Sequence, residues 1–269
     1  MSKNLYIVPY DFTPVTEKAL EYALHLGKRV HAEILILHLA ADKAKGMAKL
    51  KEMENLKSKL DAPTGVTITT LVKVGDIFSD IGKIAKEEKA QLIIMGTHGM
   101  RGLFQRFTGS HAMKLVTSAE CPFLIVQKGT EIKEVGQIAV PIDLTKESLQ
   151  IVNIAGDMAN ILNAKVNVLA EKQGDQILNT RLQNRIGIVS KQYEERDINA
   201  EINILSSRGS YGKKIMNFVK QNDVGLIAFS YHTESLLPQF DSFAQKLITN
   251  KSALPVLVIN SKLASALYF

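Results

Sequence analysis

The chain repeats itself at an interval of about 132 residues. The segment Val-Pro-Tyr-Asp-Phe-Thr at 8–13 returns as Val-Pro-Ile-Asp-Leu-Thr at 140–145. Towards the end of each copy, Lys-Leu-Val-Thr at 114–117 returns as Lys-Leu-Ile-Thr at 246–249. Because both ends of the copies keep nearly the same offset, we predict two homologous domains in tandem, residues 1–130 and residues 136–262.

Within each copy, strand-like and helix-like segments alternate. In the first copy, strands are predicted at 5–9, 34–39, 66–74, 92–95 and 123–127. These runs are apolar throughout, which is typical of parallel strands covered on both faces. We therefore predict an α/β fold made of two Rossmann-like domains, each a five-stranded parallel sheet between helices.

Composition narrows the class of protein. The chain has 269 residues, a net charge of +6 and a single cysteine. No apolar run approaches the ~20 residues of a membrane span, and one cysteine allows no internal disulfide. We therefore expect a cytoplasmic protein with no membrane partner.

Much of the positive charge lies in a lysine-rich helix predicted from residue 43 to 59. Nucleic-acid binding and a solvated helix face both explain such a run. No aromatic residues interleave with the lysines, which favours the solvated face, and no nucleic-acid partner is expected. Met47, Leu50, Met53 and Leu56 share helical spacing and predict the buried side.

A glycine pattern follows the fourth apolar run of the first copy. Gly96 and Gly99 are separated by two residues, and nine residues later come Gly109 and Ser110, just before a helix predicted from His111 to Ser118. Glycines let backbone amides approach an anion, and a helix N-terminus adds unpaired donors. The pattern predicts a phosphate site at the carboxyl edge of a parallel sheet.

With its flanking segments, the first copy resembles the nucleotide-binding branch of the universal stress protein family. That branch has a glycine, two residues, a glycine, nine residues, a glycine and then serine or threonine. The flanks also match, with Leu-His-Leu at 37–39, Val-Gly-Asp at 74–76 and Met-Gly-Thr-His-Gly at 95–99. The resemblance implies adenine nucleotide alpha hydrolase-like domains that bind ATP, with Mg²⁺ held through the phosphates.

The resemblance also implies a role for each residue at the ATP site. The adenine and ribose end is lined by Pro9, Tyr10 and Asp11, and by the backbone of Leu39. Met95 and Gly96 lie under the ribose and phosphates, and the loop over the phosphates holds His98, Gly99 and Arg101. The phosphate oxygens are bound at the helix start by Gly109, Ser110 and the amide of His111.

Several of these residues have a second interpretation. Asp11 is also placed to cap the first helix, Leu39 to belong to the core through its side chain, and Arg101 to lie exposed in its loop. Cys121 is expected to be structural rather than a nucleophile, because no partner is evident.

The second copy departs from the glycine pattern. Ser230, Thr233 and Asp241 stand where the first copy has Gly96, Gly99 and Gly109. An aspartate at a phosphate position repels the ligand. We therefore predict that only the first copy binds ATP.

The resulting hypothesis is an ATP-binding protein that acts in stress response as a nucleotide-dependent sensor or regulator. A slow ATPase or nucleotidyl-transferring enzyme and a nucleotide-free scaffold are the alternatives. No metal cluster or nucleophile–base pair supports an enzyme, so no catalytic residue is assigned. Homodimerisation and binding to a protein partner are both left open.

Overall fold

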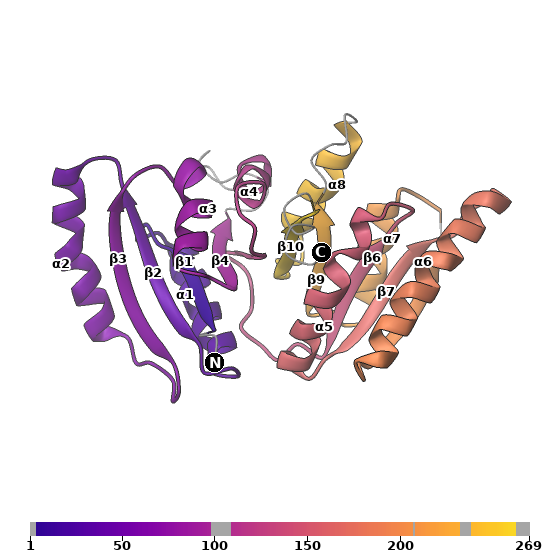
Figure 1. The fold of residues 1–269 in the computed structure, drawn as a ribbon, viewed down its shortest axis with the longest axis horizontal. Coiled ribbons are helices and arrows are strands. Elements are labelled where there is room, and N and C mark those ends of the chain that lie inside the picture. Colours follow the sequence, from indigo (N-terminus) through magenta and orange to yellow (C-terminus); the bar gives the residue numbers. More distant parts are fainter. Residues whose placement is uncertain (1–3, 98–108, 207, 232–237, 262–269) are drawn as a thin grey trace. The chain divides into compact units, whose positions relative to one another are not determined.

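The computed structural model describes residues 4–97, 109–206, 208–231 and 238–261, and the side chains of 109–111 and 238–242 lie outside that description. The chain divides into two compact units (Figure 1). The first contains Met1–Ile132 with Thr249–Ala253, and the second contains Lys133–Ile248 with Leu254–Phe269.

The first unit alternates strands and helices along the sequence. Its elements are β1 (Leu5–Pro9), α1 (Pro14–Gly27), β2 (Glu33–Ala40), α2 (Lys43–Lys59), β3 (Thr67–Val74), α3 (Ile77–Glu87), β4 (Leu92–Thr97), α4 (Gly109–Val116) and β5 (Phe123–Gln127). All strand pairs in the order β3-β2-β1-β4-β5 are parallel. The strand order reverses direction at β1 and β4, so the unit is a doubly wound α/β fold.

The second unit repeats this plan. Its elements are β6 (Gln137–Ile142), a 3₁₀ turn (Glu147–Leu149), α5 (Ile151–Leu162), β7 (Lys165–Glu171), α6 (Gln176–Glu195), β8 (Ala200–Leu205), α7 (Tyr211–Gln221), β9 (Leu226–Tyr231), α8 (Pro238–Ile248) and β10 (Val256–Asn260). The order β8-β7-β6-β9-β10 is again parallel throughout. The predicted fold class, two five-stranded parallel Rossmann-like sheets in tandem, is confirmed.

Helices cover both faces of the first sheet. Helix α1 packs on β1, β4 and β5, α2 packs on β2 and β3, and α3 lies beside α4 (Figure 1). Right-handed crossovers between parallel strands place α1 and α2 on one face and α3 and α4 on the other. Strands β1 and β4 therefore have no exposed face, and Ile7, Val8, Ile93 and Ile94 are fully buried.

Local sequence explains where the first helices begin. Pro14 is the first residue of α1, a position where its missing N–H costs no hydrogen bond. Asp76 caps α3, and its carboxylate accepts from the amides of Phe78 at 2.9 Å and Ser79 at 3.3 Å. Both helices thus start directly after a strand ends, at the same edge of the sheet.

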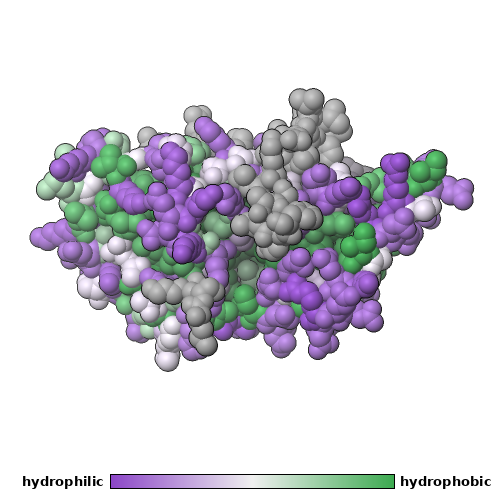
Figure 2. Space-filling model, in the orientation of Figure 1, coloured by the Kyte–Doolittle hydropathy of each residue, from purple (hydrophilic) through white to green (hydrophobic). Residues whose placement is uncertain are grey.

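The predicted buried side of α2 is only partly right. Met53 is buried, but Met47 and Leu50 are 64% and 48% exposed. The reason is Gly46, where an added Cβ would contact Ala40 and Val72, so the helix meets the sheet through this glycine rather than through Met47. Most of the lysines of α2 are exposed, in agreement with a solvated face, and hydrophilic residues cover much of the visible surface in Figure 2.

In the part of the chain that the structure describes, no helix combines the length and apolar character needed to cross a bilayer.

Candidate functional site

A crevice opens in the first sheet because β1 is shorter than both of its neighbours. The pairing of β1 with β2 ends at Pro9 and Leu37, yet β2 continues to Ala40. On its other side, the pairing of β1 with β4 ends at Ile7 and Ile93, while β4 continues to Thr97. Ligands of open α/β sheets bind at such a point, beyond the carboxyl ends of the strands.

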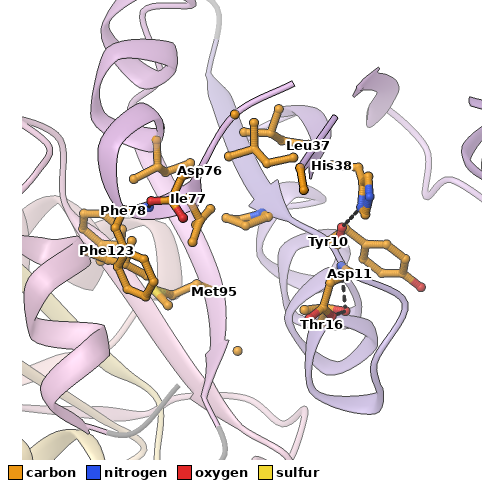
Figure 3. A pocket seen from close by; sticks show the side chains of 17 residues that line it. Tyr10, Asp11, Thr16, Leu37, His38, Asp76, Ile77, Phe78, Met95 and Phe123 are labelled. Carbon is orange, nitrogen blue, oxygen red and sulfur yellow. Dashed lines mark hydrogen bonds between the residues drawn. The ribbon is translucent and has the colours of Figure 1, made fainter. Parts of the chain in front are cut away.

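A cavity of about 520 Å³ occupies this crevice. Figure 3 shows Tyr10, Asp11, Leu37 and His38 on one side and Ile77 and Phe78 on the other. The lining is mainly apolar with a few polar groups, as is usual for sites that hold a flat organic ligand. The complete lining is Pro9, Tyr10, Asp11, Thr16, Leu37, His38, Leu39, Ala41, Gly75, Asp76, Ile77, Phe78, Ile81, Met95, Gly96, Leu115 and Phe123.

Six residues predicted for the ATP site line this one cavity: Pro9, Tyr10, Asp11, Leu39, Met95 and Gly96. They come from the ends of three strands that are separated by up to 87 positions in the sequence. Leu39 is half-exposed and faces the cavity rather than lying in the core.

Asp11 braces the turn between β1 and α1 through one of its two carboxylate oxygens. Its Oδ1 accepts from the Thr13 amide at 3.1 Å, the Thr13 hydroxyl at 2.6 Å and the Thr16 hydroxyl at 3.1 Å. The residue at the N-cap position of α1 is Thr13, so Asp11 supports the cap rather than forming it. Because all three bonds use Oδ1, Oδ2 is the oxygen placed to accept from a ligand.

His38 is held in one tautomer at the rim of the cavity. Its Nδ1 lies 2.7 Å from the carbonyl oxygen of Tyr10. A carbonyl only accepts, so Nδ1 carries a hydrogen, and in the neutral imidazole Nε2 is then the acceptor. Tyr10 is buried, and desolvation, reinforced by the Glu17 and Asp11 carboxylates, raises the pKa of its phenol to about 12, so the phenol is neutral.

Phe12 links this rim to α2. It has a positive φ of 65°, packs edge-on against Tyr10 and lies 5.7 Å from the ring of His38. The Lys49 ammonium lies 4.4 Å from the centre of the Phe12 ring, a cation–π contact. The aromatic cluster fixes the loop that carries Asp11.

Gly96 is required by packing as well as by any ligand. A Cβ at this position would lie 2.3 Å from the carbonyl oxygen of Val15, in the first turn of α1. Such a contact is far shorter than van der Waals distance, so any larger residue has to push α1 away from β4. The first glycine of the motif therefore sets how closely helix and strand approach.

The loop before α3 forms the opposite wall. A Cβ on Gly75 would lie 2.6 Å from Oδ2 of Asp80, and that oxygen accepts from the amide of Asp76 at 2.8 Å. This hydrogen bond, followed by that of Ser79 and the attraction of Lys83, lowers the pKa of Asp80. Val-Gly-Asp at 74–76 thus builds a tight helix start that presents Ile77 and Phe78 to the cavity.

Helix α4 begins at Gly109, two residues before the predicted His111. Gly109, Ser110 and His111 therefore form its first turn. A helix that follows a parallel strand starts at the carboxyl edge of the sheet, which is the edge where the cavity lies. His98, Gly99 and Arg101 fall outside the described residues.

Sequence reasoning left His38, Ile77 and Phe78 out of the site, and these residues line the cavity. The sequence did contain a signal for these residues. His38 stands in Leu-His-Leu near the end of β2, and Asp76 stands in Val-Gly-Asp at the end of β3, next to Ile77 and Phe78. In a parallel sheet, all strand ends meet at one edge.

Cys121 is not activated. Burial is the main cause that raises the pKa of its thiol to about 12, so the thiol stays protonated at neutral pH. Among the described side chains, no group of three histidine, cysteine or acidic residues is arranged to hold a metal ion.

The chain has relatives among known proteins. The model of the universal stress protein family matches residues 6–127. Universal stress protein YxiE of Bacillus subtilis is 31% identical over 147 residues, which cover 46% of this chain and 99% of that protein. A universal stress protein of Methanocaldococcus jannaschii is 30% identical over 148 residues, covering 47% of this chain and 85% of its own length.

A solved structure resembles the full length of the chain. A universal stress protein of Archaeoglobus fulgidus has a TM-score of 0.77 at 17% identity, and the match covers 97% of this chain and all of the other. At this identity, the likeness concerns the fold.

Proposed function

The chain belongs to the universal stress protein family, and we propose that its first unit binds ATP and that the protein acts as a nucleotide-dependent sensor or regulator in stress response. One observation carries the proposal: six of the residues expected at the site line a single cavity at the point where the strand order reverses. The cavity is a suitable size for a small ligand, since such sites usually measure about 300–1,000 Å³.

The lining suits an adenine nucleoside. Leu37, Leu39, Ile77 and Phe78 offer apolar surface to a purine, and the backbone of Leu39 lies beyond the last β1–β2 pair. Asp11 Oδ2 and His38 Nε2 are acceptors, and the ribose hydroxyls and the adenine amino group are donors. Pro9 and Tyr10 complete this end of the site.

The phosphates are assigned to the other end. Met95 and Gly96 lie under the ribose and phosphates, and the amides of Gly109, Ser110 and His111 at the start of α4 bind phosphate oxygens. His98, Gly99 and Arg101 are proposed to close over them. Mg²⁺ enters with the phosphates, because it is commonly held through them with few protein ligands.

The first test identifies the nucleotide directly. Protein as purified is denatured, and the released small molecules are separated by chromatography; ATP is expected at close to one equivalent per chain. Calorimetric titration of nucleotide-free protein with Mg-ATP follows. Protein that carries no nucleotide and shows no heat of ATP binding contradicts the proposal.

A substitution copied from the second unit tests the phosphate end. Gly109→Asp places a carboxylate where phosphate is proposed, and we expect at least a tenfold loss of ATP affinity, equal to about 1.4 kcal/mol. Gly174→Asp is the matched control, because its Cβ meets open space on the second unit. Equal affinities in the two variants would show that the phosphates lie elsewhere.

The alternatives have their own readouts. Release of ADP from Mg-ATP under multiple-turnover conditions identifies a slow ATPase. A purified partner that binds equally well with and without ATP favours the scaffold. The cytoplasmic location stays a prediction, which fractionation of cells expressing a tagged chain tests.

A further inference from the structure

In the second unit, a tyrosine lies in the crevice that corresponds to the cavity of the first. Helices α3 and α7 have the same length, and Ile77 and Tyr211 are their first residues. Ile77 lines the first cavity with its aliphatic side chain. The Tyr211 hydroxyl instead reaches the carbonyl oxygens of Ile142 at 2.8 Å and Leu169 at 2.6 Å.

Those two carbonyls correspond to the end of the first cavity where the adenine base is proposed to bind. Ile142 follows the Val-Pro of β6 as Tyr10 follows that of β1, and Leu169 pairs with Pro141 as Leu37 pairs with Pro9. One phenolic hydrogen is shared between two acceptors at the tip of the crevice. Tyr211 therefore places an aromatic ring, with a hydrogen-bond donor at its end, between the strands where the first unit has open space.

Phe243 extends the filling towards the start of α8. Its ring stacks on that of Tyr211 with centres 5.8 Å apart and planes 4° from parallel. By the 132-residue offset, Phe243 stands where the first unit has His111. Helices α7 and α8 lie side by side (Figure 1), and Gly212 allows this, because a Cβ there would lie 3.3 Å from the Phe243 ring.

An ion pair closes the outer side. The Lys214 ammonium on α7 lies 2.7 Å from the Glu171 carboxylate at the end of β7, and the Lys214 side chain is only 10% exposed. Glu171 takes the position of Leu39, which lines the cavity in the first unit. Helix α7 is thus tied to the sheet directly beside Tyr211.

We propose that the second unit keeps the crevice of the first but fills it permanently with its own Tyr211 ring, stacked on Phe243, in the place of an aromatic ligand. The second unit is then held in a ligand-filled state whatever the nucleotide supply, and only the first unit responds. This last step rests on the proposed function of the first unit, whereas the filling of the crevice does not.

Removing the ring tests the proposal. Tyr211→Ala in the full chain is titrated with p-cresol, which is the missing side chain as a free molecule. We expect one added binding site per chain and a rise of several degrees in the unfolding temperature with millimolar p-cresol. Tyr211→Phe keeps the ring and is not expected to gain the site. Tyr193→Ala removes a buried tyrosine from α6 and is the control for adenosine, which is larger than the ring that this variant leaves out.

Restoring the residues of the first unit tests whether the space suits a purine nucleoside. In Tyr211→Ile/Phe243→His, we expect adenosine to bind with one more equivalent than in wild type, and adenosine avoids the repulsion between Asp241 and a phosphate. If the Tyr211→Ala variant does not fold, the double variant is used for the test in its place. An increment in neither titration, or the same increment of adenosine in Tyr193→Ala, overturns the proposal. Adenosine binding to wild type, measured alongside, reports on the first unit alone. If the first unit binds no adenosine, the added equivalent in the second unit of the double variant can still be measured.

Discussion

The two units share a fold and differ in what lies at the ends of their central strands. In the first, β1, β2 and α3 surround a cavity that reaches Asp11, and in the second, Tyr211 lies between the corresponding strands and donates to their carbonyls. The aspartate after the first strand of each unit nevertheless makes the same bonds, because Asp143 accepts from the amide and hydroxyl of Thr145 as Asp11 does from those of Thr13. The aspartate is therefore part of the fold, and the open cavity is what distinguishes the first unit.

The comparison extends to the helix behind the crevice. Gly96 in β4 allows α1 to start as an α-helix against the strand, whereas the second unit has Ser230 at that position and a 3₁₀ turn before α5. The Ser230 hydroxyl is buried and has no hydrogen-bond partner among the described residues. Serine in β9 and the altered helix start occur together, as expected if the extra atoms need more room.

Exchanging these two residues is expected to give the largest effect. Gly96→Ser should lower the free energy of unfolding of the first unit by about 3 kcal/mol, because its Cβ would meet the Val15 carbonyl. Ser230→Gly should change the second unit by less than about 1 kcal/mol. Denaturant unfolding of both variants measures the difference, and equal losses would mean that packing against α1 does not select the glycine.

Removing each aspartate separates folding from binding. Asp11→Ala and Asp143→Ala should each cost about 1.5 kcal/mol, because each leaves donors at a helix start without their acceptor. Only Asp11→Ala should also weaken ATP binding. Urea unfolding and calorimetry on the same samples provide both readouts; a stability loss confined to Asp11→Ala would break the equivalence of the two turns.

Alkaline pH should lower the stability of the second unit through the phenol of Tyr211 in its filled crevice. Burial, followed by the charges of Asp143 and Glu171, raises the pKa of Tyr211 well above its ordinary value of 10.0. The unfolded chain loses this proton at a lower pH than the folded chain does. The contribution of the protonated Tyr211 to the free energy of unfolding is therefore complete below pH 10 and is lost as the pH rises towards the folded pKa.

We therefore expect Tyr211→Phe to reduce the decline in stability above pH 10 by about 1.4 kcal/mol for each pH unit. Urea titrations at several pH values between 9 and 11 measure the slope. Tyr193→Phe removes a second tyrosine whose pKa is raised by burial, and it should reduce the slope in the same direction. A slope unchanged by Tyr211→Phe would mean that its hydroxyl titrates freely.

The smallest expected effect concerns the aromatic rim. Lys49→Met removes the cation over Phe12 together with its ion pair to Glu52, and should cost the first unit about 0.5 kcal/mol. The second unit has Leu144 where the first has Phe12, so no such contact has a counterpart there. Lys51→Met, an exposed lysine on the same helix, should leave the unfolding midpoint unchanged; similar losses in both variants would assign the effect to helix charge.

Most of the fold followed from local patterns. The offset between Val-Pro-Tyr-Asp and Val-Pro-Ile-Asp predicted two similar domains, and apolar runs predicted the parallel strands, because burial on both faces demands apolar residues at every position. Helix starts set by a proline or an aspartate cap, as at Pro14 and Asp76, are signals of the same local kind, since they act within one helical turn. Met47 and Leu50 were misassigned because the contact made by Gly46 depends on strands beyond the helix.

The site divides in the same way. The alternation of strands and helices along the sequence alone indicated where strands end. It therefore indicated which residues, such as Asp11 and Gly96, lie together at one edge of the sheet. Only the tertiary structure decided that one crevice is open and the other filled, because Tyr211 reaches carbonyls 42 and 69 positions earlier in the sequence. Side-chain filling depends on which chain-distant surfaces face each other, and no local periodicity records that.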